Sequence, residues 1–135
     1  MATLSDSQAT EVDTVGGRFA RGLAAKDSAS IRDLLHPEID LRGLTPNRGW
    51  EAVGPDAVLT LLLRDWFEDS DEIEAVEHLE TDAFSDCERV GYRFRVNRPG
   101  GRSLVEQQVY LTARDGRIDW MRIVCSGFRP VSSDE

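Results

Sequence analysis

Glu106, Gln108 and Tyr110 are the best candidates for acid–base chemistry in this sequence, because they alternate along one predicted strand. Residues two apart on a strand share a face. A carboxylate held among apolar side chains loses hydration, and its pKa rises toward the range that suits a general base. A tyrosine hydroxyl beside it can donate to a developing oxyanion. We expect Glu106 and Tyr110 to be catalytic; the alternative is that the three groups satisfy one another and only shape a binding pocket.

A predicted hairpin decides which face these side chains occupy. Asp115-Gly116 lies between two β-rich runs, which is the strongest short signal for a two-residue hairpin turn. If Arg114 pairs with Arg117, the polar trio shares a face with three residues of the next strand: Met121, Ile123 and Cys125. An apolar wall with a few polar groups set in it is typical of a small-molecule pocket.

Asp40 and Arg42 form a second candidate pair on a strand predicted over 38–44. We expect both to line the same pocket, with Asp40 as the alternative catalytic base. An arginine two residues away would keep the carboxylate ionised and lower its basicity. The other interpretation is an ordinary ion pair that closes the end of the sheet.

Aromatic residues are expected to complete the wall of the pocket. Tyr92 and Phe94 alternate on a strand predicted over 89–97, Trp50 lies on a loop over 45–54, and Trp66 lies on the third predicted helix. The full set expected to contact a ligand is Arg42, Trp50, Trp66, Tyr92, Phe94, Gln108, Met121, Ile123 and Cys125.

The sequence predicts neither a metal site nor a cofactor. Its two histidines lack the flanking ligands of a zinc site, and no glycine-rich phosphate loop is present. Cys87 and Cys125 are too few for a disulfide scaffold, so both are predicted to be free, structural thiols.

Composition limits the partners. The 135 residues include 16 Lys and Arg against 25 Asp and Glu, a net charge of −9 that repels nucleic acid and anionic lipid surfaces. No apolar run approaches the roughly 18 residues of a membrane span. The first residues have no basic or apolar segment of a secretory signal. A cytoplasmic protein without nucleic-acid or membrane partners is expected.

The elements that must position these residues change in type along the chain. A helix is predicted from a capping box at Ser5–Gln8 to about Lys26, a short second helix is capped by Ser28 and stopped by Pro37, and a third begins at Pro55. After the strand over 38–44, further strands are predicted over 73–82, 89–97 and 104–113, followed by the last strand of the hairpin. This order indicates one α+β domain over 1–135, with loose ends at 1–5 and 131–135.

Three segments resemble the nuclear transport factor 2-like superfamily, and within it the SnoaL-like proteins: LLHPEIDLRG, the Gly54-Pro55 helix start, and DGRIDWMRIVCSGFRP. The resemblance implies a cone-shaped, curved antiparallel sheet wrapped around three N-terminal helices, with a pocket inside and often a dimer through the convex face. Asp40 lies close to the position of the catalytic base in the isomerases of this superfamily. An epoxide-hydrolase-like site would have two carboxylates bracketing an arginine, with Tyr and Asn positioning water.

Four functions remain open at this point. The leading hypothesis is cofactor-independent acid–base isomerisation, cyclisation or dehydration of a partly apolar carbonyl compound. The alternatives are a non-catalytic small-molecule-binding module and an epoxide-hydrolase-like enzyme; a third possibility is an interaction protein that docks a partner on its convex sheet. We also expect a homodimer through an apolar convex patch made by Val109, Leu111, Trp120 and Val124.

Overall fold

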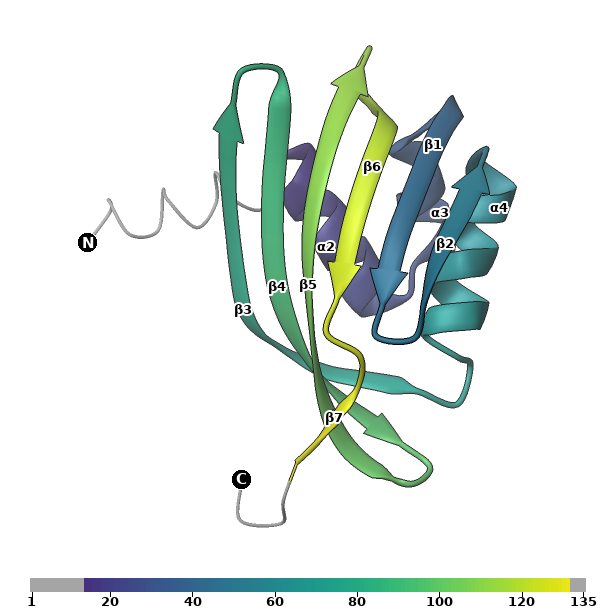
Figure 1. Cartoon of the computed structure of the whole chain (residues 1–135), viewed down its shortest axis with the longest axis vertical. Coiled ribbons are helices and arrows are strands. Elements are labelled where there is room, and N and C mark those ends of the chain that lie inside the picture. The colour runs from purple at the N-terminus through teal and green to yellow at the C-terminus, as the bar shows by residue number, and fades with distance from the viewer. Residues whose placement is uncertain (1–13, 132–135) are drawn as a thin grey trace, which may run out of the picture.

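The computed structural model describes residues 14–131, which form one curved, open sheet with helices packed against its concave face (Figure 1). The predicted α+β class is confirmed, as is the order of helices before a long antiparallel meander. The described residues contain no helix long and apolar enough to cross a membrane.

Helix α2 (Val15–Ala25) is capped by Thr14, whose hydroxyl accepts the Gly17 N–H at 2.9 Å. Helix α3 (Ser28–Asp33) is capped by Asp27, one residue earlier than predicted, because the Asp27 carboxylate accepts the Ser30 N–H at 3.1 Å. The capping box predicted at Ser5–Gln8 lies outside the described residues.

The third helical segment begins as predicted, with Pro55 in the first turn of α4 (Pro55–Thr60). It continues without a break into η1 (Leu61–Trp66), a π-helical turn. Such turns are rare and frequently occur at functional sites. Here the turn ends at Trp66, whose ring is buried under the sheet.

The sheet has the strand order β2-β1-β6-β5-β4-β3, with the short β7 paired to β5. The strands are β1 (Leu35–Thr45), β2 (Arg48–Val53), β3 (Glu72–Phe84), β4 (Cys87–Arg98), β5 (Gly101–Arg114), β6 (Arg117–Cys125) and β7 (Arg129–Pro130). Two features were not predicted. Residues 48–53 form β2 rather than part of a loop, and β1 lies parallel to β6, so the sheet is mixed. β2, α4 and η1 connect β1 to the antiparallel strands β3–β6. This long connection allows β1 to pair with the edge of β6 while running parallel to it.

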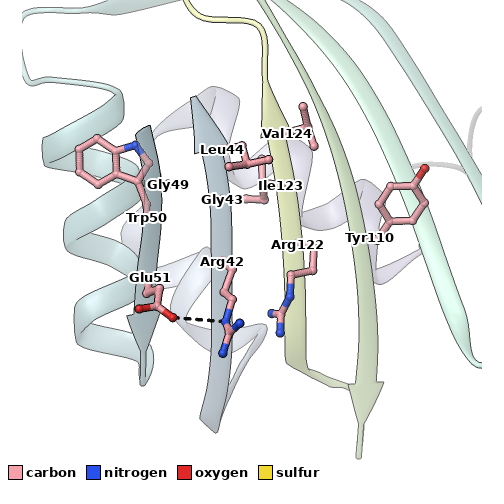
Figure 2. A pocket seen from close by; sticks show the side chains of 10 residues that line it. All are labelled: Arg42, Gly43, Leu44, Gly49, Trp50, Glu51, Tyr110, Arg122, Ile123 and Val124. Carbon is pink, nitrogen blue, oxygen red and sulfur yellow. Dashed lines mark ion pairs between the residues drawn. The ribbon is translucent and has the colours of Figure 1, made fainter. Parts of the chain in front are cut away.

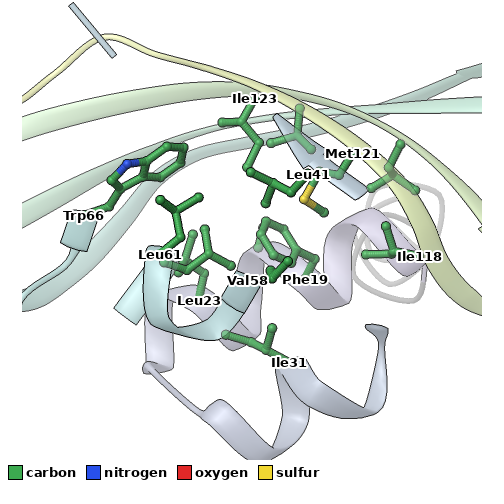
Figure 3. Packing of buried hydrophobic residues seen from close by; sticks show 14 of the residues in the cluster. Phe19, Leu23, Ile31, Leu41, Val58, Leu61, Trp66, Ile118, Met121 and Ile123 are labelled. Atoms are coloured by element: carbon green, nitrogen blue, oxygen red, sulfur yellow. The ribbon is translucent and has the colours of Figure 1, made fainter. Parts of the chain in front are cut away.

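The core lies between the helices and the concave face of the sheet (Figure 3). Apolar side chains from both layers are withdrawn from solvent almost completely, each contributing about 1.5–3 kcal/mol by burial. They include Phe19 and Leu23 of α2, Ile31 of α3, Val58 of α4, Leu41 of β1, Phe94 of β4, Val109 of β5 and Met121 of β6.

A bulge in the β5–β6 hairpin reverses the predicted faces of β5. Arg114 pairs with Arg117 as predicted, but the register shifts between Thr112 and Ala113, so Thr112 lies opposite Trp120. An extra residue on one strand of a pair shifts every later partner by one position. Beyond the bulge Gln107 therefore faces Cys125, and Gln107 rather than Gln108 lies on the concave face.

Candidate functional site

A hollow at the open end of the concave face is the candidate site, and we call it the mouth pocket. Its volume is about 460 Å³, within the range of small-molecule sites. It is enclosed by the β1–β2 turn, the end of η1 and the segment after β6. Its lining residues are Thr45, Pro46, Asn47, Trp50, Asp65, Trp66, Phe67, Glu68, Arg98, Gln107, Cys125, Ser126, Gly127, Phe128 and Arg129.

A chain of buried polar groups forms the floor of the mouth pocket. The Tyr92 hydroxyl donates to Gln107 Oε1 at 2.5 Å, and Gln107 Nε2 donates to Cys125 Sγ at 3.3 Å. Gln107 and Tyr92 are each only 1% exposed. Burial, and secondarily the neighbouring Cys125, raises the pKa of Tyr92 well above its ordinary value, so the phenol stays neutral and serves as a donor.

Aromatic rings form much of the wall. Trp50 meets Trp66 edge to face with ring centres 6.2 Å apart, and Phe67 meets Phe128 in the same way at 5.7 Å. Both arrangements are favourable for aromatic quadrupoles. The indole N–H of Trp66 is buried and has no acceptor among residues 14–131.

The rim carries a fixed cluster of charges centred on Arg98. Its guanidinium lies 3.1 Å from the buried Asp71 carboxylate and 3.6 Å from Glu68, and stacks over the Phe128 ring at 3.8 Å. Asp71 also accepts the Glu68 N–H, while Lys26 Nζ donates to the backbone carbonyls of both residues. Arg98 is thus positioned by contacts from several segments.

Seven of the predicted ligand-contacting residues lie on the concave side of the sheet or against it. Trp50, Trp66 and Cys125 line the mouth pocket itself. Tyr92 reaches the pocket through Gln107, whereas Phe94, Met121 and Ile123 are fully packed in the core.

The predicted orientation of Glu106, Gln108 and Tyr110 is wrong. All three point to the convex side, because the bulge in β6 shifts the register by one residue. The Glu106 carboxylate is 47% exposed and forms an ion pair with Arg93 at 2.6 Å, so it is not a desolvated base inside the cone. Gln108 Oε1 accepts a hydrogen bond from Arg89 Nη1 at 3.3 Å, and the Tyr110 side chain is 37% exposed.

Asp40 and Arg42 share one face of β1 as expected, but that face is also the convex one. The neighbours of Asp40 and Arg42 on β1, Ile39, Leu41 and Gly43, point inward instead. Asp40 lies 3.6 Å from Arg122 in a half-buried pair, and Arg42 lies 3.4 Å from Glu51 in an exposed one. The ordinary ion-pair interpretation therefore describes Asp40 better than a pocket base does.

A second hollow lies on the convex face (Figure 2), and we call it the outer groove. Its volume is about 500 Å³. Apolar side chains form its base, beside two arginines that pair across neighbouring strands, Arg42 and Arg122. Its lining residues are Arg42, Gly43, Leu44, Gly49, Trp50, Glu51, Tyr110, Arg122, Ile123 and Val124.

Gln107 and Arg98 are the pocket residues that sequence reasoning missed. Gln107 alternates with Val109 and Leu111, which were expected on the convex face, although all three are buried on the concave side. The spacing of the apolar residues in β6 contained the missing signal. The buried residues of β6 are Ile118, Met121, Ile123 and Cys125. Their spacing is two residues except between Ile118 and Met121, where it is three, and such an extra residue in a strand indicates a bulge.

The predictions about thiols and metals concern residues that the structure describes. Cys87 and Cys125 are both free, Cys87 being half-buried and Cys125 buried. Residues 14–131 contain no cluster of three or more His, Cys, Asp or Glu side chains that could hold a metal ion.

Comparison with known proteins shows similarity of structure without similarity of sequence. No protein-family model and no curated protein matches the sequence. An isomerase candidate from Rhodopseudomonas palustris superposes with a TM-score of 0.65 at 20% identity, over 82% of this chain and 87% of that one. An LEH-like epoxide hydrolase from M. tuberculosis gives 0.64 at 16% identity, over 87% and 84%.

A candidate SnoaL-like polyketide cyclase from Mesorhizobium loti gives a TM-score of 0.59 at 18% identity, over 81% of this chain and 94% of that one. The chain therefore has the nuclear transport factor 2-like fold, and the resemblance expected from the sequence is confirmed at the level of the fold. Proteins with this fold differ widely in chemistry, so function has to be argued from the pocket.

Proposed function

We propose that this protein binds a small, largely apolar organic molecule in the mouth pocket without transforming it. The observation that carries the proposal is the state of the pocket floor. Tyr92, Gln107 and Cys125 hydrogen-bond to one another, whereas a catalytic base would need a carboxylate or imidazole facing the ligand. Among residues 14–131 the buried polar or charged side chains are Asp71, Ser103 and Gln107, and of these only Gln107 lines the mouth pocket.

The leading hypothesis from the sequence, acid–base isomerisation, cyclisation or dehydration, loses support because Asp40 and Glu106 face away from the pocket. The carboxylates that do line it, Asp65 and Glu68, are exposed at its rim. A proton transfer there would occur in contact with water, which weakens the electrostatic contribution of the site.

Small-molecule capture from native extract tests the proposal. Tagged protein is incubated with the extract, washed and denatured, and the released compounds are identified by mass spectrometry. We expect one compound to be enriched with the wild-type protein and lost with Asn47→Trp, which places a bulky ring at the rim without disturbing a buried residue. The matched control is Phe84→Trp at the exposed β3–β4 turn, which should retain the compound.

Incubating the captured compound with fresh protein separates binding from catalysis. Recovery of the unchanged compound supports a binding module. Conversion to a product that requires the wild-type pocket contradicts the proposal and favours an enzyme.

One observation favours a second candidate, an epoxide-hydrolase-like enzyme. Arg98 lies between two carboxylates, Glu68 and Asp71, and Asn47 lines the same pocket. The epoxide hydrolase from M. tuberculosis shares the fold. Asp71 is 3% exposed and already accepts both Arg98 and a backbone N–H, so Glu68 would have to activate the water. Hydrolysis of cyclohexene oxide that disappears in Glu68→Gln would support this candidate.

A further inference from the structure

Residues 127–131 cross one side of the mouth pocket, and we call them the closing strap. They run from the end of β6 to β7 beside β5 (Figure 1). Residues 127–129 of the strap line the pocket. The groups on the pocket floor are withdrawn from solvent, since Gln107 is 1% exposed and Cys125 is 9% exposed. A molecule can make full contact with that floor only if one side of the pocket opens.

The closing strap is attached to the sheet by a short ladder. β7 contributes two residue pairs with β5, Leu104 with Arg129 and Ser103 with Pro130. Pro130 has no N–H, so this ladder lacks one of its donors. The Val131 N–H adds a bond to the Arg102 carbonyl at 3.0 Å. Segments held by few contacts open locally at a lower free energy than the core strands do.

Gly127 separates the strap from a part of the chain that is firmly held. Just before it, the Ser126 N–H donates to the Glu106 carbonyl and the Ser126 hydroxyl accepts the Glu106 N–H, both at 2.9 Å. Gly127 itself has a φ of +77°, a conformation that glycine adopts more readily than any other residue. Its backbone rests on the β1–β2 turn, because a Cβ atom at Gly127 would lie 2.8 Å from Cγ of Pro46. Rotation at Gly127 would therefore move the strap without breaking the β5–β6 pairing.

Phe128 holds the strap closed through its ring. The ring lies edge to face against Phe67 with centres 5.7 Å apart, and the Arg98 guanidinium stacks over it at 3.8 Å. Arg98 is in turn held by Asp71 and Glu68, so it forms a fixed support for the ring. When the ring leaves, the ion pair between Arg98 and the buried Asp71 stays intact, and no buried charge is left without its partner.

Space lies on both sides of the Phe128 ring. A second hollow of about 460 Å³, which we call the side hollow, is bordered by Phe128 and Pro130 of the strap. Glu68, Arg98 and Phe128 line both the side hollow and the mouth pocket, so these side chains separate the two spaces. The ring therefore has room to swing away without displacing a core residue.

We propose that the closing strap is a lid over the mouth pocket, hinged at Gly127 and latched by Phe128 on Arg98, and that it opens to admit molecules to the floor at Gln107 and Cys125. The proposal rests on the proposed ligand site and adds to it the route of entry. Opening of a lid commonly governs exchange between an enclosed site and solvent.

The Cys125 thiol reports opening of the lid. Its sulfur accepts the Gly127 N–H at 3.5 Å and Gln107 Nε2 at 3.3 Å, so it is shielded while the lid is closed. Iodoacetamide is the probe, and alkylation of Cys125 is followed over time by peptide mass spectrometry, which distinguishes it from Cys87. We expect a rate that urea hardly changes below the unfolding transition, because local opening exposes little surface. A rate that rises with urea as steeply as global unfolding would overturn the proposal.

A reversible lock tests the lid directly. Leu104 and Arg129 are opposed in the antiparallel β5–β7 pair, where Cα atoms lie about 4.5–5.5 Å apart, a separation that a disulfide can span. In the oxidised double variant Leu104→Cys/Arg129→Cys, alkylation of Cys125 should be at least about tenfold slower than in the wild type, because the strap can no longer leave β5. Reduction should restore the rate. Equal rates in the oxidised variant and the wild type would overturn the proposal.

Two substitutions should favour the open lid. Phe128→Ala removes the latch and should accelerate alkylation of Cys125 by about tenfold, the order of magnitude of a cation–π contact. Gly127→Ala should also accelerate it, because the added Cβ atom meets Pro46 at 2.8 Å. The matched control is Phe84→Ala, the same deletion at the exposed β3–β4 turn, which should leave the rate unchanged. Equal rates for Phe128→Ala and Phe84→Ala would overturn the latch.

The outcomes separate the lid from the ligand site. If Phe128→Ala does not fold, the lock and the urea dependence of the wild type still decide the matter. Alkylation that the lock suppresses supports the lid even where capture from native extract yields no compound, a result that contradicts the ligand site alone. Alkylation that the lock leaves unchanged overturns the lid, and the ligand site stands.

Discussion

At the scale of single residues, Gln107 connects the stability of the protein with its pocket. Gln107→Leu leaves the buried Tyr92 hydroxyl without its acceptor, so we expect the free energy of unfolding to fall by about 1–3 kcal/mol. Gln108→Leu, its outward neighbour, should change it by no more than about 0.5 kcal/mol. Urea unfolding measures both. The double variant Tyr92→Phe/Gln107→Leu should recover part of the loss, since neither polar group then remains unpaired; simple additivity of the two losses would contradict this pairing.

Tyr92 also makes stability depend on alkaline pH. Its folded-state pKa is raised well above the ordinary 10.0 by burial, with Cys125 as the smaller cause. Because the neutral phenol is favoured in the folded state, its contribution is fully present below pH 10 and is lost as the pH rises above that value. Thermal unfolding followed from pH 8 to 11 should show a steeper decline above pH 10 for the wild type than for Tyr92→Phe. If stability declines with pH equally in the wild type and in Tyr92→Phe, the folded state does not oppose ionisation of the Tyr92 phenol.

At the scale of elements, the close approach of β1 to η1 positions the pocket wall. A side chain at Gly43 would meet the Trp66 ring at 2.6 Å, whereas one at Gly49 of β2 would find no atom closer than 3.8 Å. Gly43→Ala should therefore lower the free energy of unfolding by about 1–3 kcal/mol and shift the indole signal of Trp66. Gly49→Ala should have almost no effect on either measurement. Equal effects of the two substitutions would show that β1 and η1 are not closely packed.

The helices and strands could largely be predicted from the sequence, whereas the way two of the strands pair could not. Pro55, the Asp115-Gly116 turn and the period-two runs predicted α4 and the four long strands, because each depends on local backbone preferences. The site depends on one non-local detail. The bulge that places Gln107 inside and Glu106 outside adds a single residue between Ile118 and Met121, and turn chemistry alone does not determine it. Parallel pairing of β1 with β6 likewise joins segments about 80 residues apart, as in Leu41 with Met121, which local patterns do not encode.

At the scale of the whole molecule, the outer face remains a proposed dimer interface, with corrected residues. Val109 and Leu111 are buried inside the cone, but Leu44 is 57% exposed and Val124 is 53% exposed at the outer groove. We propose that two copies associate through this face. Val124→Arg should convert the dimer into a monomer, because it adds a third cation beside Arg42 and Arg122. Phe84→Arg, at an exposed turn, should leave the dimer intact. Light scattering after gel filtration measures both, and a wild-type monomer at tens of micromolar, on the order of ordinary dimer affinities, would contradict the proposal.

The central claim is that a ligand occupies the mouth pocket on the concave side and not the outer groove. Intermolecular nuclear Overhauser effects between the protein and the compound captured from native extract test it most directly, because the two hollows share only Trp50 and otherwise present different side chains. We predict contacts from the ligand to the rings of Trp66 and Phe128. Contacts confined to the methyl groups of Leu44 and Val124 would place the ligand on the convex face and contradict the account.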